Sequence, residues 1–422
     1  MRLLAVVALL VVLVGSGHAP AWAQAAGWYL TPSFRLTEEF DDNIFARSSG
    51  KESDFISVFS PGIEAGYRSE PFTLLVNSGF EADIFAEHPE LNDATSAWHA
   101  GFNLRYLPIR PLTLGLHVAY VETNRPSSLP SDFGPILIAP VVSSAASPPS
   151  AAPPPSAGTP PSDGSPPSTV PPSESAASLI APATVVEFGR RRATFLSASP
   201  SAVYHFTPLT TGSAAYTYSH STIEGGVANT THSTGLSLSH QLTALDTGTL
   251  GFRVTVFESE GVATRTSYTP TLGWTRKLTP ETTLSLSGGP RFSDGSVGPE
   301  VSARLDREFK LAKASLGYSR SEGFVVGQAG TVNTETYSGS VNFVPLRSLL
   351  VGVGPTITRI SGGTTSDTTI YALGATASYQ ILRWLTARAS YRFAFQERAG
   401  GDILHNVFSL GLEASYPYRI GQ

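Results

Sequence analysis

Eight very tight turns divide this chain into hairpins, and their regular spacing restricts the fold more than any other feature. They lie at Arg68–Pro71, Leu107–Pro111, Thr207–Thr210, Leu245–Thr249, Leu278–Glu281, Phe309–Leu311, Pro345–Ser348 and Leu382–Trp384. A second, usually longer connection rich in Gly, Ser, Thr, Asn and Asp separates consecutive tight turns. Antiparallel hairpins with short turns at one end and longer loops at the other are typical of a membrane β-barrel.

The segments between the turns alternate apolar and polar residues. In 385–396, Leu385 and Tyr391 fall on one face and Arg388 and Arg392 on the other, because successive side chains of a strand point to opposite faces. The runs are longer than the five or six residues usual in globular strands and suit tilted membrane spans. We count eighteen, so the predicted fold is all-β: a transmembrane antiparallel up-and-down β-barrel of about 16–18 strands, with the short turns periplasmic.

Prolines inside five of these runs are the main objection to this fold. They are Pro61, Pro200, Pro270, Pro299 and Pro355. A proline lacks the N–H that a strand donates to its neighbour, so an interior proline should break the ladder of hydrogen bonds. All five share the apolar, outward parity of their strands, and local bulges are the expected accommodation.

The first residues indicate export. Arg2 precedes the apolar run Leu3–Val14, and small residues lead to Ala21-Trp22-Ala23. This is the layout of a secretory signal peptide, and the run is too short for a membrane anchor of about 20 residues. We therefore expect a signal peptide over 1–23 and an outer-membrane barrel over 24–422, in a Gram-negative bacterium.

Composition supports a barrel in lipid and excludes several kinds of chemistry. Only 14% of the residues are charged, against about 25% in typical globular domains. The chain has no cysteine, which excludes disulfides, thiol catalysis and Cys-ligated metals. A net charge of −5 is too mild to indicate a partner, and no basic tract suggests nucleic acid.

One connection, 125–188, is exceptional. It holds 16 of the 32 prolines, spaced by Ser, Ala, Thr and Gly, and almost no large apolar residue from Ser143 to Ser178. Such a segment cannot bury enough surface to order itself. We expect a disordered Pro/Ser-rich extracellular loop; the alternative is a folded constriction loop that enters the pore.

With the apolar faces outward, charges of both signs line the predicted lumen. The candidates are Arg35, Glu64, Glu81, Asp83, Arg105, Arg253, Arg291, Glu300, Arg304, Asp306, Arg388 and Arg392. These side chains either tune the selectivity of a pore or pair with one another across strands. Both interpretations stay open from sequence.

Three consecutive arginines follow the proline-rich segment. Strand parity points Arg191 inward and Arg190 and Arg192 outward, near the external rim. Outward arginines there could bind lipopolysaccharide phosphates, a geometry that the guanidinium suits. The alternative is a solvated strand end.

The sequence predicts no enzyme, cofactor or metal. The acidic run Glu38–Asn43 is dense enough to suggest a divalent cation, but it lacks EF-hand spacing and fits a solvated strand end better. Neither G-x-S-x-G nor H-E-x-x-H occurs, although His220, His232 and His240 lie on neighbouring predicted strands.

The start of the predicted mature chain resembles a known family. The segments are Leu30–Phe34, Glu38–Phe45, Ser53–Ile56 and Ser60–Gly62. They are similar to the opening of a family of bacterial outer-membrane β-barrels, several of which are associated with exopolysaccharide biosynthesis and export. The resemblance implies an outer-membrane pore and favours polysaccharide passage, and it implies no catalytic or binding residues. Such barrels usually end on an aromatic residue, whereas this chain continues past Tyr418 to Gln422.

Taken together, these features predict a passive porin-like channel for small solutes, as a monomer or a homotrimer. Expected partners are outer-membrane lipid, lipopolysaccharide and the barrel assembly machinery, with polysaccharide as a further possibility. Two other functions stay open: a conduit for exopolysaccharide export, and a structural or adhesive scaffold that displays the proline-rich loop.

Overall fold

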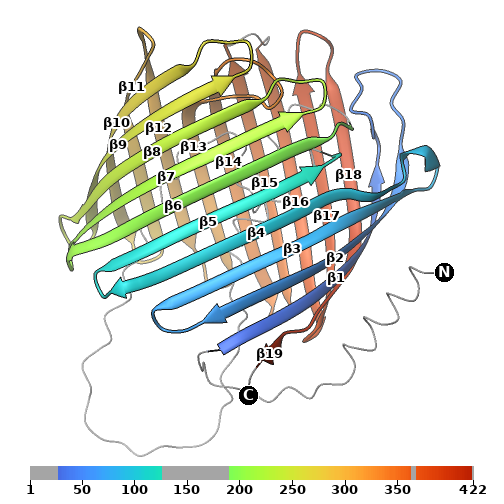
Figure 1. The fold of residues 1–422 in the computed structure, drawn as a ribbon, viewed down its shortest axis with the longest axis horizontal. Helices are drawn as coiled ribbons and strands as arrows, with labels where there is room; N and C mark the ends of the chain where they lie inside the picture. The colour runs from blue at the N-terminus through green and yellow to red at the C-terminus, as the bar shows by residue number, and fades with distance from the viewer. Residues whose placement is uncertain (1–26, 126–189, 363–366, 421–422) are drawn as a thin grey trace, which may run out of the picture.

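The computed structural model describes residues 27–125, 190–362 and 367–420, and it forms one closed antiparallel barrel of 18 strands (Figure 1). The strands are β1 Gly27–Asp41, β2 Asp54–Arg68, β3 Phe72–Phe85, β4 Asp93–Ile109, β5 Leu112–Thr123, β6 Ala193–Thr207, β7 Thr210–Ile223, β8 Asn229–Gln241, β9 Asp246–Ser259, β10 Arg265–Thr279, β11 Thr282–Ser293, β12 Ser296–Glu308, β13 Ala312–Gly323, β14 Val332–Leu346, β15 Leu349–Ser361, β16 Thr368–Leu382, β17 Leu385–Glu397 and β18 Ile403–Ser415. A 3₁₀ turn, η1 Pro89–Leu91, and a short strand, β19 Tyr418–Ile420, complete the described elements. No helix among them is long and apolar enough to cross a membrane.

Closure comes from the first strand, which pairs with both β2 and β18. Residues Ser33–Asp41 of β1 pair with β18, and Trp28–Leu30 pair with β19. Strand β19 therefore continues the seam past Pro417. A closed sheet leaves no unpaired edge, which is the condition for strands to lie in hydrocarbon.

The structure confirms the predicted turns and the even strand number. Each of the eight tight turns joins an even-numbered strand to the next odd-numbered one. Gly27, where β1 begins, pairs with Arg68 beside the first tight turn, so the described chain ends lie at the short-turn end (Figure 1). The longer connections lie at the opposite end, the long-loop end. The predicted signal peptide, 1–23, lies outside the described residues, as does all of the proline-rich segment except Arg125.

The strand prolines interrupt pairing on one side only. Pro270 in β10 pairs with Phe252 in β9. On the other side of β10, the residues between Tyr268 and Leu272 have no partners in β11. Pro61 behaves alike, paired with β1 and unpaired with β3. A Cβ at Gly289 would lie 1.9 Å from the Pro270 carbonyl oxygen, so glycine is required where β11 crosses this break. Each of these prolines thus interrupts the pairing of two or three residues on one side and leaves the barrel intact.

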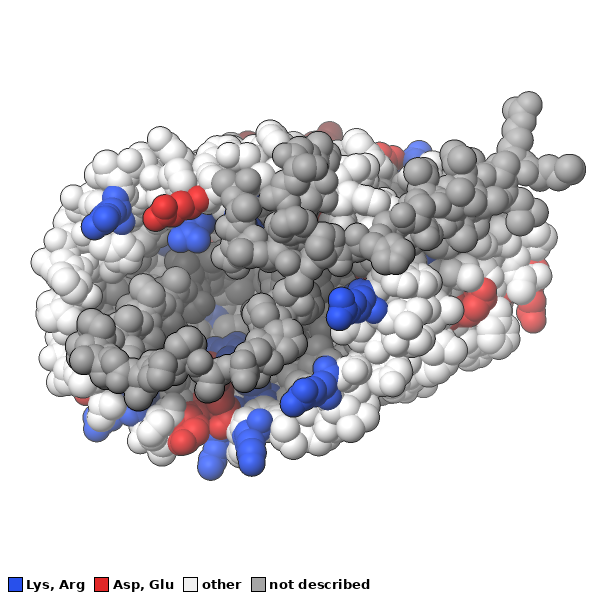
Figure 2. Space-filling model, turned by 90° about the horizontal axis from the view of Figure 1, so that it is seen from below, with Lys and Arg blue, Asp and Glu red and all other residues white. Residues whose placement is uncertain are grey.

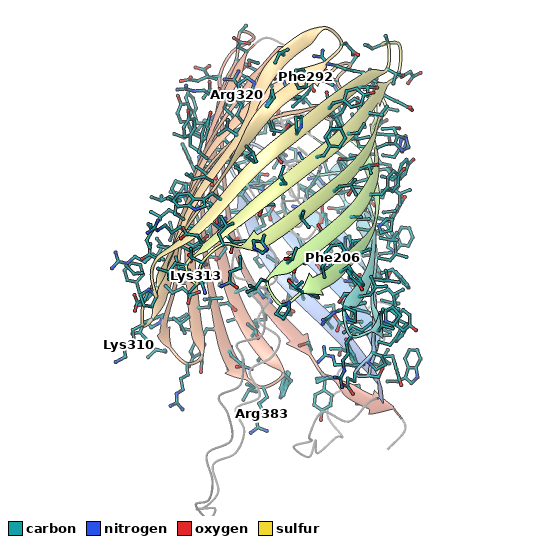
Figure 3. All side chains as sticks on the ribbon, turned by 90° about the vertical axis from the view of Figure 1, so that its left-hand side faces the viewer. Phe206, Phe292, Lys310, Lys313, Arg320 and Arg383 are labelled. Carbon is teal, nitrogen blue, oxygen red and sulfur yellow. The ribbon has the colours of Figure 1, made fainter. Side chains whose placement is uncertain are left out.

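The outer face of the barrel is apolar, as alternation predicts. Large apolar side chains stand exposed along the strands, including Leu272, Val297 and Leu316, each more than 60% exposed (Figure 3). Exposed aromatic residues, among them Trp274 and Trp98, lie toward the two ends of the wall. A contiguous apolar surface of this kind marks contact with lipid rather than water.

The inner face is lined by hydroxyl groups that bond across neighbouring strands. Four Ser–Ser pairs have Oγ–Oγ distances of 2.6–2.7 Å. They are Ser213–Ser237, Ser287–Ser302, Ser315–Ser340 and Ser390–Ser409. These hydroxyl groups make the wall that faces the lumen polar without adding charge.

Candidate functional site

The loop between β13 and β14 folds into the lumen at the long-loop end. Its apolar residues Phe324, Val325 and Val326 are 3–5% exposed, although they belong to a loop. An apolar loop of this kind would be costly in water, because buried aliphatic and aromatic side chains each gain about 1.5–3 kcal/mol over exposed ones. The loop is therefore held inside by packing.

This packing reaches two different parts of the barrel wall. Phe324 and Val326 share one apolar cluster with inward side chains of β5–β7 and β9: Val121, Ala193, Phe195, Ile223 and Phe257. Val325 packs in a second cluster with Val332, Ile360 and Ile370 of β14–β16. In the ring of eighteen strands β5 lies opposite β14, so the two clusters span the lumen. We call Phe324–Gly327 and these clusters the septum.

Glycines allow the septum to meet the β7–β8 loop. The Val227 N–H donates to the Gly327 carbonyl oxygen at 3.1 Å, forming an isolated bridge between the two loops. Gly327 has a φ of 76°, and a Cβ on Gly226 would lie 2.9 Å from the Gly327 Cα. A side chain at either position would separate the loops or strain the backbone.

A cluster of five charged residues lies near the long-loop ends of β1, β3 and β5. The Arg125 guanidinium contacts Glu39 at 2.7 Å, Asp83 at 3.1 Å and Glu81 at 3.9 Å. Arg190 contacts Asp83 at 3.3 Å and stacks on the Phe85 ring, 4.2 Å from its centroid. Burial alone would lower the pKa of Arg125, but the three carboxylates raise it above its usual range. We call Arg125, Arg190, Glu39, Glu81 and Asp83 the Arg125 cluster.

A second charged cluster lies on the wall formed by β9–β13. Glu322 contacts Arg265 at 3.0 Å and Arg291 at 3.3 Å, and Arg253 contacts Glu300 at 2.6 Å. Arg253, Arg291, Glu300 and Glu322 line a cavity of about 20 Å³, which holds no more than a water molecule. The side chains of this cluster are therefore closely packed against one another.

Nearer the short turns, the inner charges are more open. Arg35 and Arg388 both contact Glu413, at 3.3 Å and 2.9 Å. Arg304 forms two hydrogen bonds with Asp306, at 2.7 and 2.8 Å. About half of the Arg35 and Arg304 side chains remains exposed, so these pairs can exchange with a passing ion or solute.

The inward position of the twelve candidate lumen residues remains a prediction from strand alternation, and the structure shows which of them lie together. It brings Glu81 and Asp83 together with Arg125, and it brings Arg253 and Arg291 to the second cluster. Arg105 and Glu64 stand apart from both clusters. Sequence reasoning missed Glu39, Arg125 and Glu322 as members of these networks. Glu39 belongs to the acidic run already noted. Strand alternation predicts an outward side chain for Glu322, so the sequence contained no sign of its inward contacts.

The prediction that Arg190 points outward to lipopolysaccharide is wrong. Its side chain is only 10% exposed and pairs with Asp83, whose side chain is fully buried. The reason is that β6 begins at Ala193, so strand parity does not extend to Arg190. Arg192 does lie outside, 60% exposed, where it pairs with Glu122 at 2.7 Å. Its contact with lipopolysaccharide remains a prediction.

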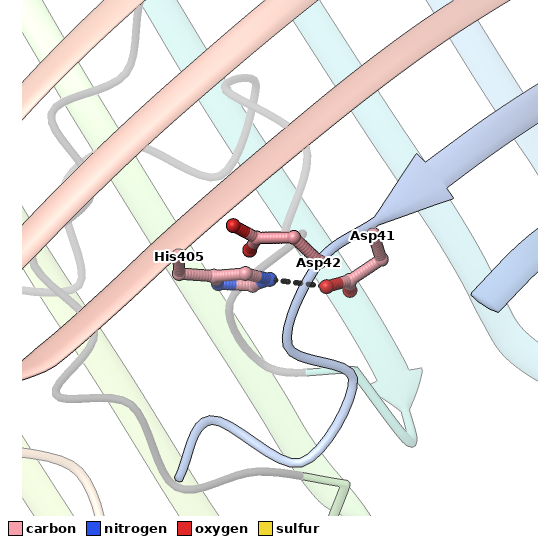
Figure 4. Close-up of side chains that lie close together, drawn as sticks. All are labelled: Asp41, Asp42 and His405. Carbon is pink, nitrogen blue, oxygen red and sulfur yellow. Dashed lines mark hydrogen bonds and ion pairs between the residues drawn. The ribbon is translucent and has the colours of Figure 1, made fainter. Parts of the chain in front are cut away.

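The acidic run also ties β1 to β18 (Figure 4). The Asp41 carboxylate accepts a 2.7 Å hydrogen bond from His405 Nε2, and the Asp42 carboxylate accepts two from Asn406. Ligand-type atoms of Asp41, Asp42 and His405 lie within 4.8 Å of one another. Since protein donors already engage both carboxylates, the cluster is explained as a clasp on the barrel seam.

His88 forms a pH-sensitive contact in the loop between β3 and β4. Its ring nitrogens lie 2.7 Å from Asp54 and 3.1 Å from Glu52. The hydrogen bond to Asp54, followed by the bond to Glu52, raises the pKa of His88 above its usual 6.5. Only the doubly protonated, charged ring can donate hydrogen bonds from both nitrogens, one to each carboxylate.

We therefore expect the contribution of His88 to stability to disappear at high pH. A raised folded-state pKa gives stabilisation that is full below about 6.5 and is lost as the pH rises through the raised value. The unfolding temperature of the wild type should exceed that of His88→Gln at pH 6, and the two should converge at alkaline pH. A difference that grows with pH would contradict this assignment.

Comparisons with known proteins identify no family for the chain. No protein-family model matches the chain, and no curated protein matches it in sequence. Solved structures with similar folds include OccAB4 of Acinetobacter baumannii, with a TM-score of 0.46 and 8% identity over 94% of this chain and 99% of that one. The outer-membrane protein OpdK of Pseudomonas aeruginosa has a TM-score of 0.46 and 10% identity over 93% and 99%. The siderophore receptor PirA of the same organism has a TM-score of 0.43 and 6% identity over 92% and 80%. Similarity at this level assigns no function to the chain.

Proposed function

We propose that the chain is an integral outer-membrane barrel that acts as a passive, porin-like channel for small polar solutes. The observation that carries this proposal is the combination of a closed 18-strand wall, an apolar outer face and a hydroxyl-lined inner face. Barrels of 16–18 strands enclose an aqueous lumen by their size alone. Diffusion through such a lumen needs no cofactor, energy source or catalytic group.

The geometry also indicates where passage is controlled. Figure 2 shows the molecule from below, where Lys and Arg side chains, with some Asp and Glu, surround the middle of the face. At the long-loop end, the septum divides the lumen and the second charged cluster is closely packed. In this proposal a solute passes beside the septum, where both charged clusters lie close to its path. Selection there acts by size and by charge at close range.

The cellular setting follows from the same features. The apolar outer face requires a bilayer, and the predicted secretory signal would carry the chain across the inner membrane of a Gram-negative cell before the barrel inserts into the outer membrane. Lipopolysaccharide and the barrel assembly machinery are the partners that this route requires. A monomer suffices for the channel, because the barrel closes within one chain; a homotrimer remains compatible with it.

Single-channel recording in planar bilayers tests the proposal. The purified barrel should give discrete, ohmic steps in potassium chloride, and neutral sugars added to the bath should reduce the current in order of size. Protein denatured before addition is the control. An intact barrel that gives no conductance contradicts the channel. Conductance blocked by one polysaccharide, and by no small sugar, would favour the export conduit instead.

A further inference from the structure

Three consecutive short turns share an arrangement that a turn in water should not have. Each places one basic residue directly beside exposed apolar residues. The segments are Phe309–Lys310–Leu311, Leu346–Arg347–Ser348 and Leu382–Arg383–Trp384, between β12 and β13, β14 and β15, and β16 and β17. We call Lys310, Arg347 and Arg383 the basic arc. Figure 3 shows Lys310 and Arg383 projecting from the end of the barrel.

The apolar neighbours of the arc have no protein cover. Leu346 is 60% exposed, Leu311 53% and Phe309 50%. Turns that face water are built mainly from Gly, Asn, Asp, Ser and Pro. Exposed leucines at three successive turn tips indicate contact with an apolar phase. Trp384, 39% exposed, is a residue type that concentrates at the boundary between hydrocarbon and headgroups.

The charges of the arc lack protein partners. Within the described chain, none of the three basic side chains forms an ion pair. The nearest acidic residue in sequence, Glu308, is engaged by Lys313 at 3.1 Å. Arg307 adds a fourth cation beside the arc, stacked 4.9 Å from the Phe309 ring centroid. The arc therefore carries positive charge that an external anion must balance.

The opposite end of the barrel differs. There several charges pair within the protein, as Arg192 does with Glu122 and Arg320 with Glu335 at 2.9 Å, and the exposed cations Lys51 and Arg359 have no exposed apolar residue next to them in sequence. The tight connection between β11 and β12 is the polar sequence Asp294-Gly295, with both residues at positive φ. Unpaired cations beside exposed apolar residues are thus a property of the short-turn end.

We propose that the basic arc binds the phosphates of anionic phospholipids, so that the short turns lie within the headgroup layer and not beyond it. The partner must offer negative charge and hydrocarbon within a few ångström of each other. A phospholipid leaflet does so, since basic side chains reach the phosphates while their apolar neighbours enter the acyl boundary. A soluble anion or a nucleic acid would leave the leucines and Trp384 in water.

Lipid binding to the detergent-purified protein tests the arc directly. Native mass spectrometry would follow titration with phosphatidylglycerol or phosphatidylcholine. The triple variant Lys310→Gln, Arg347→Gln, Arg383→Gln should lose affinity for phosphatidylglycerol by about fivefold per residue, which is about 1 kcal/mol each. Its phosphatidylcholine binding should not change.

A matched control removes the same charges at the long-loop end: Lys51→Gln, Arg191→Gln and Arg359→Gln. These side chains are exposed, and the control should bind phosphatidylglycerol like the wild type. Equal losses in both triple variants would overturn the proposal, because they would show a general charge effect. A loss of lipopolysaccharide binding with phosphatidylglycerol binding intact would overturn it as well.

Depth in the bilayer gives a second measurement, which does not depend on affinity. Because the chain has no cysteine, Ser348→Cys can carry a single nitroxide label at a turn tip of the arc. In vesicles containing phosphatidylglycerol, oxygen should relax this label more than a water-soluble nickel complex does. A label at Ser49→Cys, in the long loop after β1, should show the reverse. A Ser348→Cys label as open to nickel as the Ser49→Cys label would refute insertion.

Discussion

Removing the apolar side chains of the septum is expected to raise single-channel conductance by more than about twofold, because a constriction dominates the resistance of a pore. The variant Phe324→Ala, Val325→Ala, Val326→Ala empties both clusters that hold the loop across the lumen. The loop would lose its anchor on β5–β9 and widen the passage at the long-loop end. Planar-bilayer recording in potassium chloride measures the change.

The control places alanines on the outer face instead. Val297→Ala and Leu316→Ala remove exposed apolar side chains from β12 and β13 and should leave the conductance unchanged. Heat-modifiable mobility on gels would show that both variants still form barrels. Unchanged conductance in the septum variant would mean that the solute path does not pass the septum, and the proposed site of control would then be wrong.

The barrel wall was predictable because it is encoded by short-range signals. Tight turns, strand length and alternation each act over a few residues, so β17, Leu385–Glu397, could be placed with its apolar side chains outward. Even the prolines followed this parity. Pro61 and Pro270 lose pairing on one side only. Each strand has two neighbours, so pairing with the other neighbour still holds the strand in the sheet at these positions.

The contents of the lumen were not predictable in the same way. Phe324-Val325-Val326 is short, apolar and flanked by glycines, which fits a strand end as well as a folded loop. Its inward position depends on partners such as Val121 and Ile370, which are far away in sequence. The sequence offered the proline-rich segment 125–188 only as an alternative constriction loop, and that segment lies outside the described residues apart from Arg125. Within the described residues, the loop after β13 crosses the lumen.

Strand parity also fails at strand ends, and the charged residues lie mostly there. Arg190 and Glu322 both turn inward against the parity of the neighbouring strand, and both meet buried partners of opposite charge. The electrostatic gain from those partners exceeds the local preference of the backbone. Arg253 and Glu300 lie within strands, where alternation predicts the same face for both, and the two side chains form an ion pair at 2.6 Å.

Loss of the central guanidinium of the Arg125 cluster is expected to destabilise the barrel by about 3 kcal/mol. Arg125→Gln leaves Glu39, Glu81 and Asp83 close together, and among the described residues Arg190 remains as a cation that contacts Asp83. The Asp83 side chain is fully buried, and removing one partner of a buried ion pair costs about 3–5 kcal/mol because the other charge is left uncompensated. Urea unfolding of the protein in lipid vesicles, followed by tryptophan fluorescence, measures the change.

An exposed arginine on the outer face provides the control for this effect. Arg192→Gln breaks a pair with Glu122 at the same N···O distance of 2.7 Å, but Arg192 is 60% exposed, so the expected cost is under about 1 kcal/mol. The double variant Arg125→Gln, Asp83→Asn should recover part of the loss, since the charge that Arg125 balances is then absent. Equal costs for Arg125→Gln and Arg192→Gln would show that burial does not strengthen the cluster. Without that strengthening, a passing ion could compete with its contacts, and the long-loop end would be selective without being rigid.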